Sequence, residues 1–131
     1  MVEKVTMKEA LRYLQNARGI LKKAPREGRV YTDVKPVREA CGTAYLALLE
    51  AINEYLLARG LTKKELPRSY EAYQKVLRKH LSIHNGKLFR QFDMLYHRLH
   101  IAGYYRGDLY DVGVVREALD SAQEFIAKLD K

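Results

Sequence analysis

Residues 37–55 read VREACGTAYLALLEAINEY, and this stretch decides the fold. Its apolar residues recur every three or four positions, which predicts an α-helix with one buried face. That face consists of Val37, Cys41, Ala44, Leu48, Ala51, Ile52 and Tyr55. The small residues from Ala40 to Ala44 let a neighbouring backbone approach closely, so we expect this helix to form the centre of the core.

Residues flanking this stretch predict where the helix begins and ends. Asp33 is a typical N-cap, because its carboxylate can accept from the free N–H groups of the first turn. Pro36 falls in that first turn, where a missing N–H costs little. Gly60 is placed to act as the residue just after the helix, where a positive φ is common. The sequence therefore predicts a helix from Asp33 to about Ala58.

The same periodicity predicts further helices on both sides. The first begins at a Thr6-x-x-Glu9 capping box and ends before Pro25, with residues 25–32 as a loop. Others cover residues 69–83 and 87–105, and a last one begins near Asp111. Short connections favour antiparallel neighbours. We therefore expect an all-α protein, an up-and-down antiparallel four- to five-helix bundle that forms one domain over residues 1–131.

Composition narrows the class of protein. Apolar residues make up 47% and charged residues 31% of the chain, which is ordinary for a soluble globular domain. The single cysteine, Cys41, excludes an internal disulfide and favours a reducing compartment. No apolar run approaches the roughly 20 residues that span a bilayer, and the N-terminus has no secretory signal. We expect a cytoplasmic protein with no membrane contact and no cofactor.

The net charge of +8 is concentrated in two segments. Residues 1–30 and residues 78–106 each carry an excess of +5, whereas residues 107–131 are acidic at −3. If the two basic segments meet in space, they would attract phosphate or another polyanion. The alternative is a solvated face that keeps the protein soluble.

Residues 70–110 contain all four histidines and six of the ten tyrosines. On a helical wheel of about 100° per residue, one outer face of the helix over residues 87–105 gathers Arg90, Asp93, His97, His100 and Tyr104. Beside this row lie Met94, Ile101 and Tyr105, which could form the seam of a homodimer. Such a face packs against a ligand or a second subunit, unless it is an ordinary exposed face.

Three kinds of chemistry compete for these residues. Arg90 and His97 could hold a scissile phosphate and move a proton, although an arginine at such a distance before a histidine is a common spacing. Tyr104, Tyr105 and Arg106 could stack on and hold exposed bases, or simply pack at a helix end. His80 and His84 have the spacing of two metal ligands, but no third ligand stands out, so packing and helix capping are favoured over a metal.

Two segments carry a resemblance to known proteins. They are Ala40-Cys41-Gly42-Thr43-Ala44-Tyr45 and Leu99-His100-Ile101-Ala102-Gly103-Tyr104-Tyr105-Arg106-Gly107. With the basic first helix they resemble a family of small uncharacterised bacterial helical proteins with a domain of unknown function. The chain is more distantly similar to the HEPN superfamily, the higher-eukaryote and prokaryote nucleotide-binding domains. That resemblance implies a four- to five-helix bundle, homodimerisation and a role near nucleotides or RNA.

The HEPN resemblance also implies two kinds of partner chemistry. Some members are toxin-type ribonucleases with an Arg-x4–6-His motif at a dimer interface, which Arg90 and His97 match in its permissive form. Others accompany a nucleotidyltransferase. The chain has Leu99 where the tighter form of the ribonuclease motif has tyrosine. We therefore expect a non-enzymatic module that binds a nucleotide, RNA or a protein partner through Arg90, His97, His100, Tyr104, Tyr105 and Arg106, with a ribonuclease or a structural dimerising subunit as the alternatives.

Overall fold

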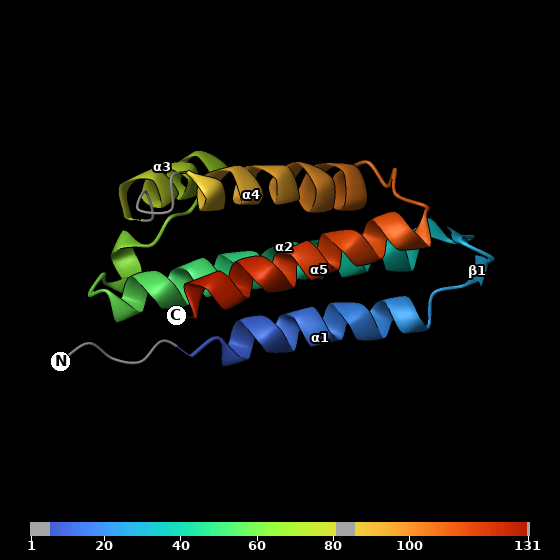
Figure 1. The fold of residues 1–131 in the computed structure, drawn as a ribbon, viewed down its shortest axis with the longest axis horizontal. Coiled ribbons are helices and arrows are strands. Elements are labelled where there is room, and N and C mark those ends of the chain that lie inside the picture. Colours follow the sequence, from blue (N-terminus) through green and yellow to red (C-terminus); the bar gives the residue numbers. More distant parts are fainter. Residues whose placement is uncertain (1–5, 81–85, 131) are drawn as a thin grey trace.

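The computed structural model describes residues 6–80 and 86–130, and its long helices run alternately in opposite directions (Figure 1). The α-helices are α1 (Lys8–Lys22), α2 (Val34–Ala58), α3 (Tyr70–His80), α4 (Lys87–Leu95) and α5 (Val112–Leu129). A 3-10 turn, η1 (Lys63–Glu65), precedes α3, and a π-helix, η3 (Tyr96–Tyr105), continues α4 without a break. Helices account for 76% of the described residues, which confirms the predicted all-α class.

The α2–α5 pair lies between α1 on one side and α3, α4 and η3 on the other (Figure 1). α2 is buried on nearly every side along its middle, and it contacts α1, α5 and η3. Ala40, Cys41, Ala44, Leu48 and Ile52 are all fully buried. The prediction that this helix forms the centre of the core is confirmed. No described residue with a polar or charged side chain is buried.

Several helix ends are where the sequence places them. The Asp33 side chain accepts from the N–H of Lys35 at 3.0 Å, and Asp111 accepts from the N–H of Val114 at 2.9 Å. Gly60 has a φ of +101°, which suits its place just beyond α2. The predicted helix over residues 69–83 is described from Tyr70 to His80, and its last part lies outside the described residues.

The predicted capping box of the first helix is wrong. The residue before α1 is Met7, which makes no side-chain capping bond, and Thr6 lies outside the helix. Glu9 instead accepts from the guanidinium of Arg12 at 2.7 and 3.0 Å. A charge-assisted pair between these side chains one turn apart replaces the weaker bond that Glu9 could make to a backbone N–H.

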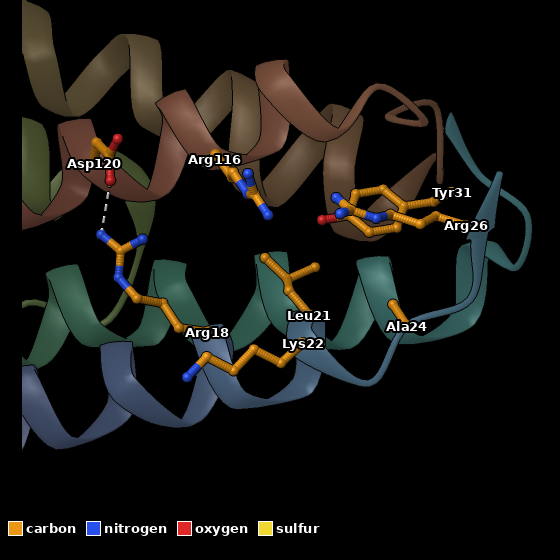
Figure 2. A pocket seen from close by; sticks show the side chains of 8 residues that line it. All are labelled: Arg18, Leu21, Lys22, Ala24, Arg26, Tyr31, Arg116 and Asp120. Atoms are coloured by element: carbon orange, nitrogen blue, oxygen red, sulfur yellow. Dashed lines mark hydrogen bonds and ion pairs between the residues drawn. The ribbon is translucent and has the colours of Figure 1, made fainter. Parts of the chain in front are cut away.

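Residues 25–32 form a small β-hairpin rather than a plain loop. Strand β1 (Arg26–Glu27) pairs antiparallel with β2 (Val30–Tyr31), and Gly28 turns the chain with a φ of +58°. The N–H of Tyr31 donates to the carbonyl of Tyr110 at 2.8 Å, which fastens the hairpin to the start of α5. Further along, Arg18 of α1 donates to Asp120 of α5 at 2.9 Å (Figure 2).

The π-helix packs closely against α2 at Gly103. A Cβ on Gly103 would lie 2.6 Å from the sulfur of Cys41 and 3.1 Å from the carbonyl oxygen of Arg98, so only glycine fits there. Beyond Tyr96 each turn holds more residues than an α-helical turn, and the N–H of Arg106 donates to the carbonyl of Ile101 at 2.8 Å. After Leu99 the next buried position is Gly103, and Ala102 is half-buried.

No helix among the described residues is long and apolar enough to cross a membrane.

We expect Gly103→Ala to lower the free energy of unfolding by about 1–3 kcal/mol, because an added methyl group overpacks a tight contact. Urea unfolding measures this change. Gly19→Ala in α1 is the matched control, since no atom lies within 4 Å of the position of its Cβ. There the helix propensity of alanine should leave stability unchanged or raise it by up to about 1 kcal/mol. A Gly103→Ala protein as stable as the parent would contradict the close contact.

The buried thiol of Cys41 should make the stability of the protein depend on pH. Burial raises the pKa of its thiol from 9.0 to about 12. Above pH 9.0 the thiol of the unfolded chain loses its proton while the native thiol keeps it, so the native state binds more protons and stability falls as pH rises. Cys41→Ala removes this titration. The stability difference between parent and Cys41→Ala should shift steadily against the parent between pH 9.0 and about 12 in urea unfolding. A constant difference would contradict the prediction.

Candidate functional site

The π-helix directs His100 and Tyr104 toward α2. The ring of Tyr104 lies over Gly42, where a Cβ would come within 2.9 Å of a ring carbon. The ring centroids of His100 and Tyr45 are 4.9 Å apart. Arg38 of α2 donates to the carbonyl of Tyr104 at 2.7 Å and to that of Tyr105 at 3.2 Å. The end of η3 is thus capped by α2, which holds the two rings in place.

Aromatic rings follow one another along this junction. Tyr70 stacks on Tyr96 with centroids 3.7 Å apart, Tyr96 lies 5.4 Å from His100, and His100 stacks on Tyr104 at 5.9 Å. These spacings are close to those of favourable ring pairs. The succession joins α3 to the end of η3 and gives one side of the molecule a continuous aromatic surface.

Two hollows open along these rings. The larger, about 520 Å³, lies between α2 and the end of η3, and the smaller, about 340 Å³, lies between α2, α3 and η3. Tyr45, Leu49 and His100 line both, so the two hollows adjoin each other. We call the whole the tyrosine–histidine groove, formed by Tyr45, Leu49, Tyr70, Tyr96, His100 and Tyr104. Its volume is in the range of small-molecule sites.

Three phenols that line the two hollows, those of Tyr45, Tyr70 and Tyr73, are held in their neutral form. Burial raises the pKa of Tyr45 well above the ordinary value for a phenol. Burial and the hydrogen bond to Asp93 do the same for the pKa of Tyr70. Burial also raises the pKa of Tyr73, whose hydroxyl donates to Asn53 at 2.9 Å. At neutral pH these three side chains therefore offer ring surface and hydroxyl groups with no phenolate charge.

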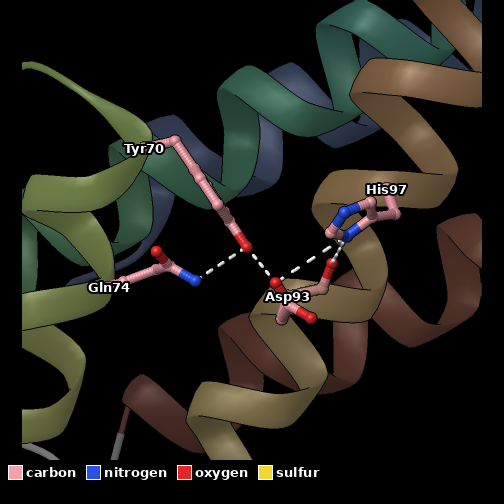
Figure 3. Close-up of polar contacts among 4 residues, drawn as sticks. All are labelled: Tyr70, Gln74, Asp93 and His97. Carbon is pink, nitrogen blue, oxygen red and sulfur yellow. Dashed lines mark hydrogen bonds and ion pairs between the residues drawn. The ribbon is translucent and has the colours of Figure 1, made fainter.

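A polar network adjoins the groove at Tyr70 (Figure 3). The Tyr70 hydroxyl donates to the carboxylate of Asp93 and accepts from the side-chain amide of Gln74 at 2.9 Å. Nδ1 of His97 donates to the backbone carbonyl of Asp93 at 2.9 Å and lies 3.7 Å from its carboxylate. Because a carbonyl only accepts, this bond assigns the proton of the neutral imidazole to Nδ1, and Nε2 is the acceptor.

The structure divides the predicted row of residues. His97 is exposed next to Asp93, whereas His100 and Tyr104 line the groove against α2. Tyr105 and Arg106 are exposed at the end of η3. A wheel of about 100° per residue misplaces the later residues because the turns of a π-helix are wider. The residues of the predicted row thus lie in two neighbouring groups along the helix.

Arg90 and His97 are not brought together. Nη1 of Arg90 lies 3.0 Å from the position of a Cβ on Gly86, so its guanidinium folds back toward the start of α4 and away from His97. His80 is half-buried at the end of α3, and His84 lies outside the described residues. Over residues 6–80 and 86–130, no three metal-ligating side chains form a cluster.

Sequence reasoning missed the groove residues from other elements. Tyr45 belongs to α2, Arg68 and Tyr70 come from the start of α3 and the segment before it, and Tyr96 opens the π-helix. The density of tyrosine in residues 70–110 is a signal that could have found Tyr70 and Tyr96, but not Tyr45 or Arg68. It does not reveal which rings meet, because that depends on how α2 packs against η3.

Comparisons with known proteins give a family and a fold. Residues 5–131 match the family model of the domain of unknown function DUF5618. A protein of unknown function from Dyadobacter fermentans has a similar solved structure, with 29% sequence identity and a TM-score of 0.79. The similarity covers 95% of this chain and 93% of that one. No curated protein matches the chain significantly. Because the family model spans nearly the whole sequence, the chain belongs to the DUF5618 family.

Proposed function

We propose that this protein is a non-enzymatic binding module that holds the base of a nucleotide, free or within single-stranded RNA, in the tyrosine–histidine groove. The observation that carries the proposal is the open hollow of about 520 Å³ beside stacked His100 and Tyr104. Aromatic side chains bind any base through its π-face, and neutral phenols and an imidazole supply hydrogen bonds to its edge. Apolar lining with a few polar groups is typical of a site for a planar ligand.

The positive charge of the protein near the groove supports the proposal that the ligand carries phosphate. The net charge is +8, and Arg68 lines the smaller hollow next to Tyr70 and Tyr96. Arg106 follows η3 directly after the two tyrosines and is exposed. A base in the groove would have its phosphate within the field of these cations, which adds a salt-dependent contribution to the affinity. A nucleotide-binding role also agrees with the HEPN-like resemblance of the sequence.

Binding fits the geometry better than cleavage does. A metal-independent ribonuclease needs a cation and a proton-transfer group at one phosphate. In this chain the guanidinium of Arg90 points away from His97. The exposed side chains of Met94 and Tyr105 favour a homodimer as part of the same proposal, because their exposed fractions are 41% and 71%. A nucleotidyltransferase-type protein partner would use the same outer side of η3.

Tyr104→Ala should weaken binding of AMP by about tenfold or more, because stacking is worth about 1–3 kcal/mol per base. Tyr110→Ala is the matched control: it removes the same kind of side chain at an exposed position that does not line the groove. Isothermal titration calorimetry measures both affinities, and circular dichroism checks that each variant keeps its helices. A short single-stranded RNA in place of AMP distinguishes a free nucleotide from a strand.

The two ligands and the two variants separate the outcomes. Tighter binding of the RNA than of AMP, with the Tyr104→Ala loss in both, assigns the groove to a strand. Similar affinities assign it to a free nucleotide. Equal losses in Tyr104→Ala and Tyr110→Ala, or no binding of either ligand by the parent, would refute the proposal.

A further inference from the structure

A second cavity lies on another part of the molecule, between the end of α1, the β-hairpin and α5 (Figure 2). Its volume is about 330 Å³. We call it the basic pocket, formed by Arg18, Lys22, Arg26, Tyr31, Arg116 and Asp120. It shares no lining residue with the tyrosine–histidine groove. The fold thus brings cations from three separate elements to one opening.

Most of the positive charge in the basic pocket has no counter-charge from the protein. Arg18 donates to Asp120 at 2.9 Å and to Gln123 at 2.8 Å. Within the described part of the chain, no carboxylate lies within ion-pair distance of Lys22, Arg26 or Arg116. Like charges in one cavity repel each other, so this arrangement gains stability when an anion enters. Asp120 is the single acidic residue that lines the pocket.

Tyr31 adds a positioned hydrogen-bond donor. Its side chain is only 3% exposed, and its hydroxyl end points toward Arg116 (Figure 2). Burial raises the pKa of the phenol, and the nearby Arg116 and Arg26 act against that rise. The backbone of Tyr31 is fixed by its pairing in the hairpin and by its hydrogen bond to Tyr110. The phenol therefore keeps its proton at neutral pH, and its hydroxyl can donate a hydrogen bond to a ligand.

The donors of the basic pocket match one class of ligand. Guanidinium groups and an ammonium only donate, so apart from Asp120 the charged groups call for an acceptor with several oxygens and more than one negative charge. Phosphate oxygens accept pairs of bonds from the planar fork of arginine. A single carboxylate would leave most of the three uncompensated cations without a partner. The ligand class is thus a phosphate or diphosphate group.

We infer that the basic pocket binds the phosphate group of a small phosphorylated molecule, with Arg26 and Arg116 as bidentate donors, Lys22 as a point charge and the Tyr31 hydroxyl as a further donor. The site is separate from the groove, so it stands whether or not the groove binds a base. It also gives a role to the basic first segment of the chain, which supplies Lys22 and Arg26.

Calorimetric titration with inorganic pyrophosphate at constant ionic strength tests the inference. The parent should bind with one-to-one stoichiometry, and Arg116→Gln should weaken binding about tenfold, because a charge-assisted bond is lost. Lys64→Gln is the control, since it removes the same charge from an exposed residue of η1, outside the pocket. It should bind as the parent does. Tyr104→Ala should also leave pyrophosphate binding unchanged, which separates this site from the groove.

Asp120→Asn tests the same site with a substitution that should strengthen pyrophosphate binding instead of weakening it. It removes the one carboxylate of the pocket and releases Arg18, so pyrophosphate should bind about tenfold more tightly. Asp120 is exposed, and a folded variant is expected because an exposed ion pair contributes little to stability. No saturable binding by the parent, equal weakening in Arg116→Gln and Lys64→Gln, or an unchanged affinity in Asp120→Asn would each overturn the inference.

Discussion

The approach of Gly103 to Cys41 is the constraint on which the candidate groove depends. A Cβ at position 103 would come within 2.6 Å of the thiol sulfur, so the backbone of η3 lies almost directly on α2. This contact needs a small residue on each helix, and the segment from Ala40 to Ala44 supplies them along α2. Close backbone approach brings the neighbouring side chains of the two helices together as well.

Beside that contact, the wide turns of η3 present imidazole and phenol side chains to the groove. With Leu99 and Gly103 both buried, the residues that follow each of them, His100 and Tyr104, face α2 and stack on each other. Tyr45 then completes the floor beside His100. Departures from α-helical geometry of this kind occur often at functional sites. The groove is thus a direct product of the way in which the core is packed.

Much of the fold could be predicted because its signals are local. The N-cap residues Asp33 and Asp111 and the apolar period of α2 depend on neighbours within a few positions. The π-helix and the partner of Gly103 could not be predicted, because Cys41 is far away in the sequence. The division of the row from Arg90 to Tyr104 likewise depends on how η3 packs against α2. Glu9 accepts from Arg12, one turn away, and does not make the predicted capping-box bond to a backbone N–H.

Residues 96–105 form a π-helix, and its hydrogen bonds can be observed directly. NMR scalar couplings across hydrogen bonds connect an amide nitrogen to the carbonyl carbon that accepts from it. The account predicts a coupling between the nitrogen of Arg106 and the carbonyl carbon of Ile101. A coupling from Arg106 to Ala102 instead would show an ordinary α-helix, and it would contradict both the turn and the groove that depends on it.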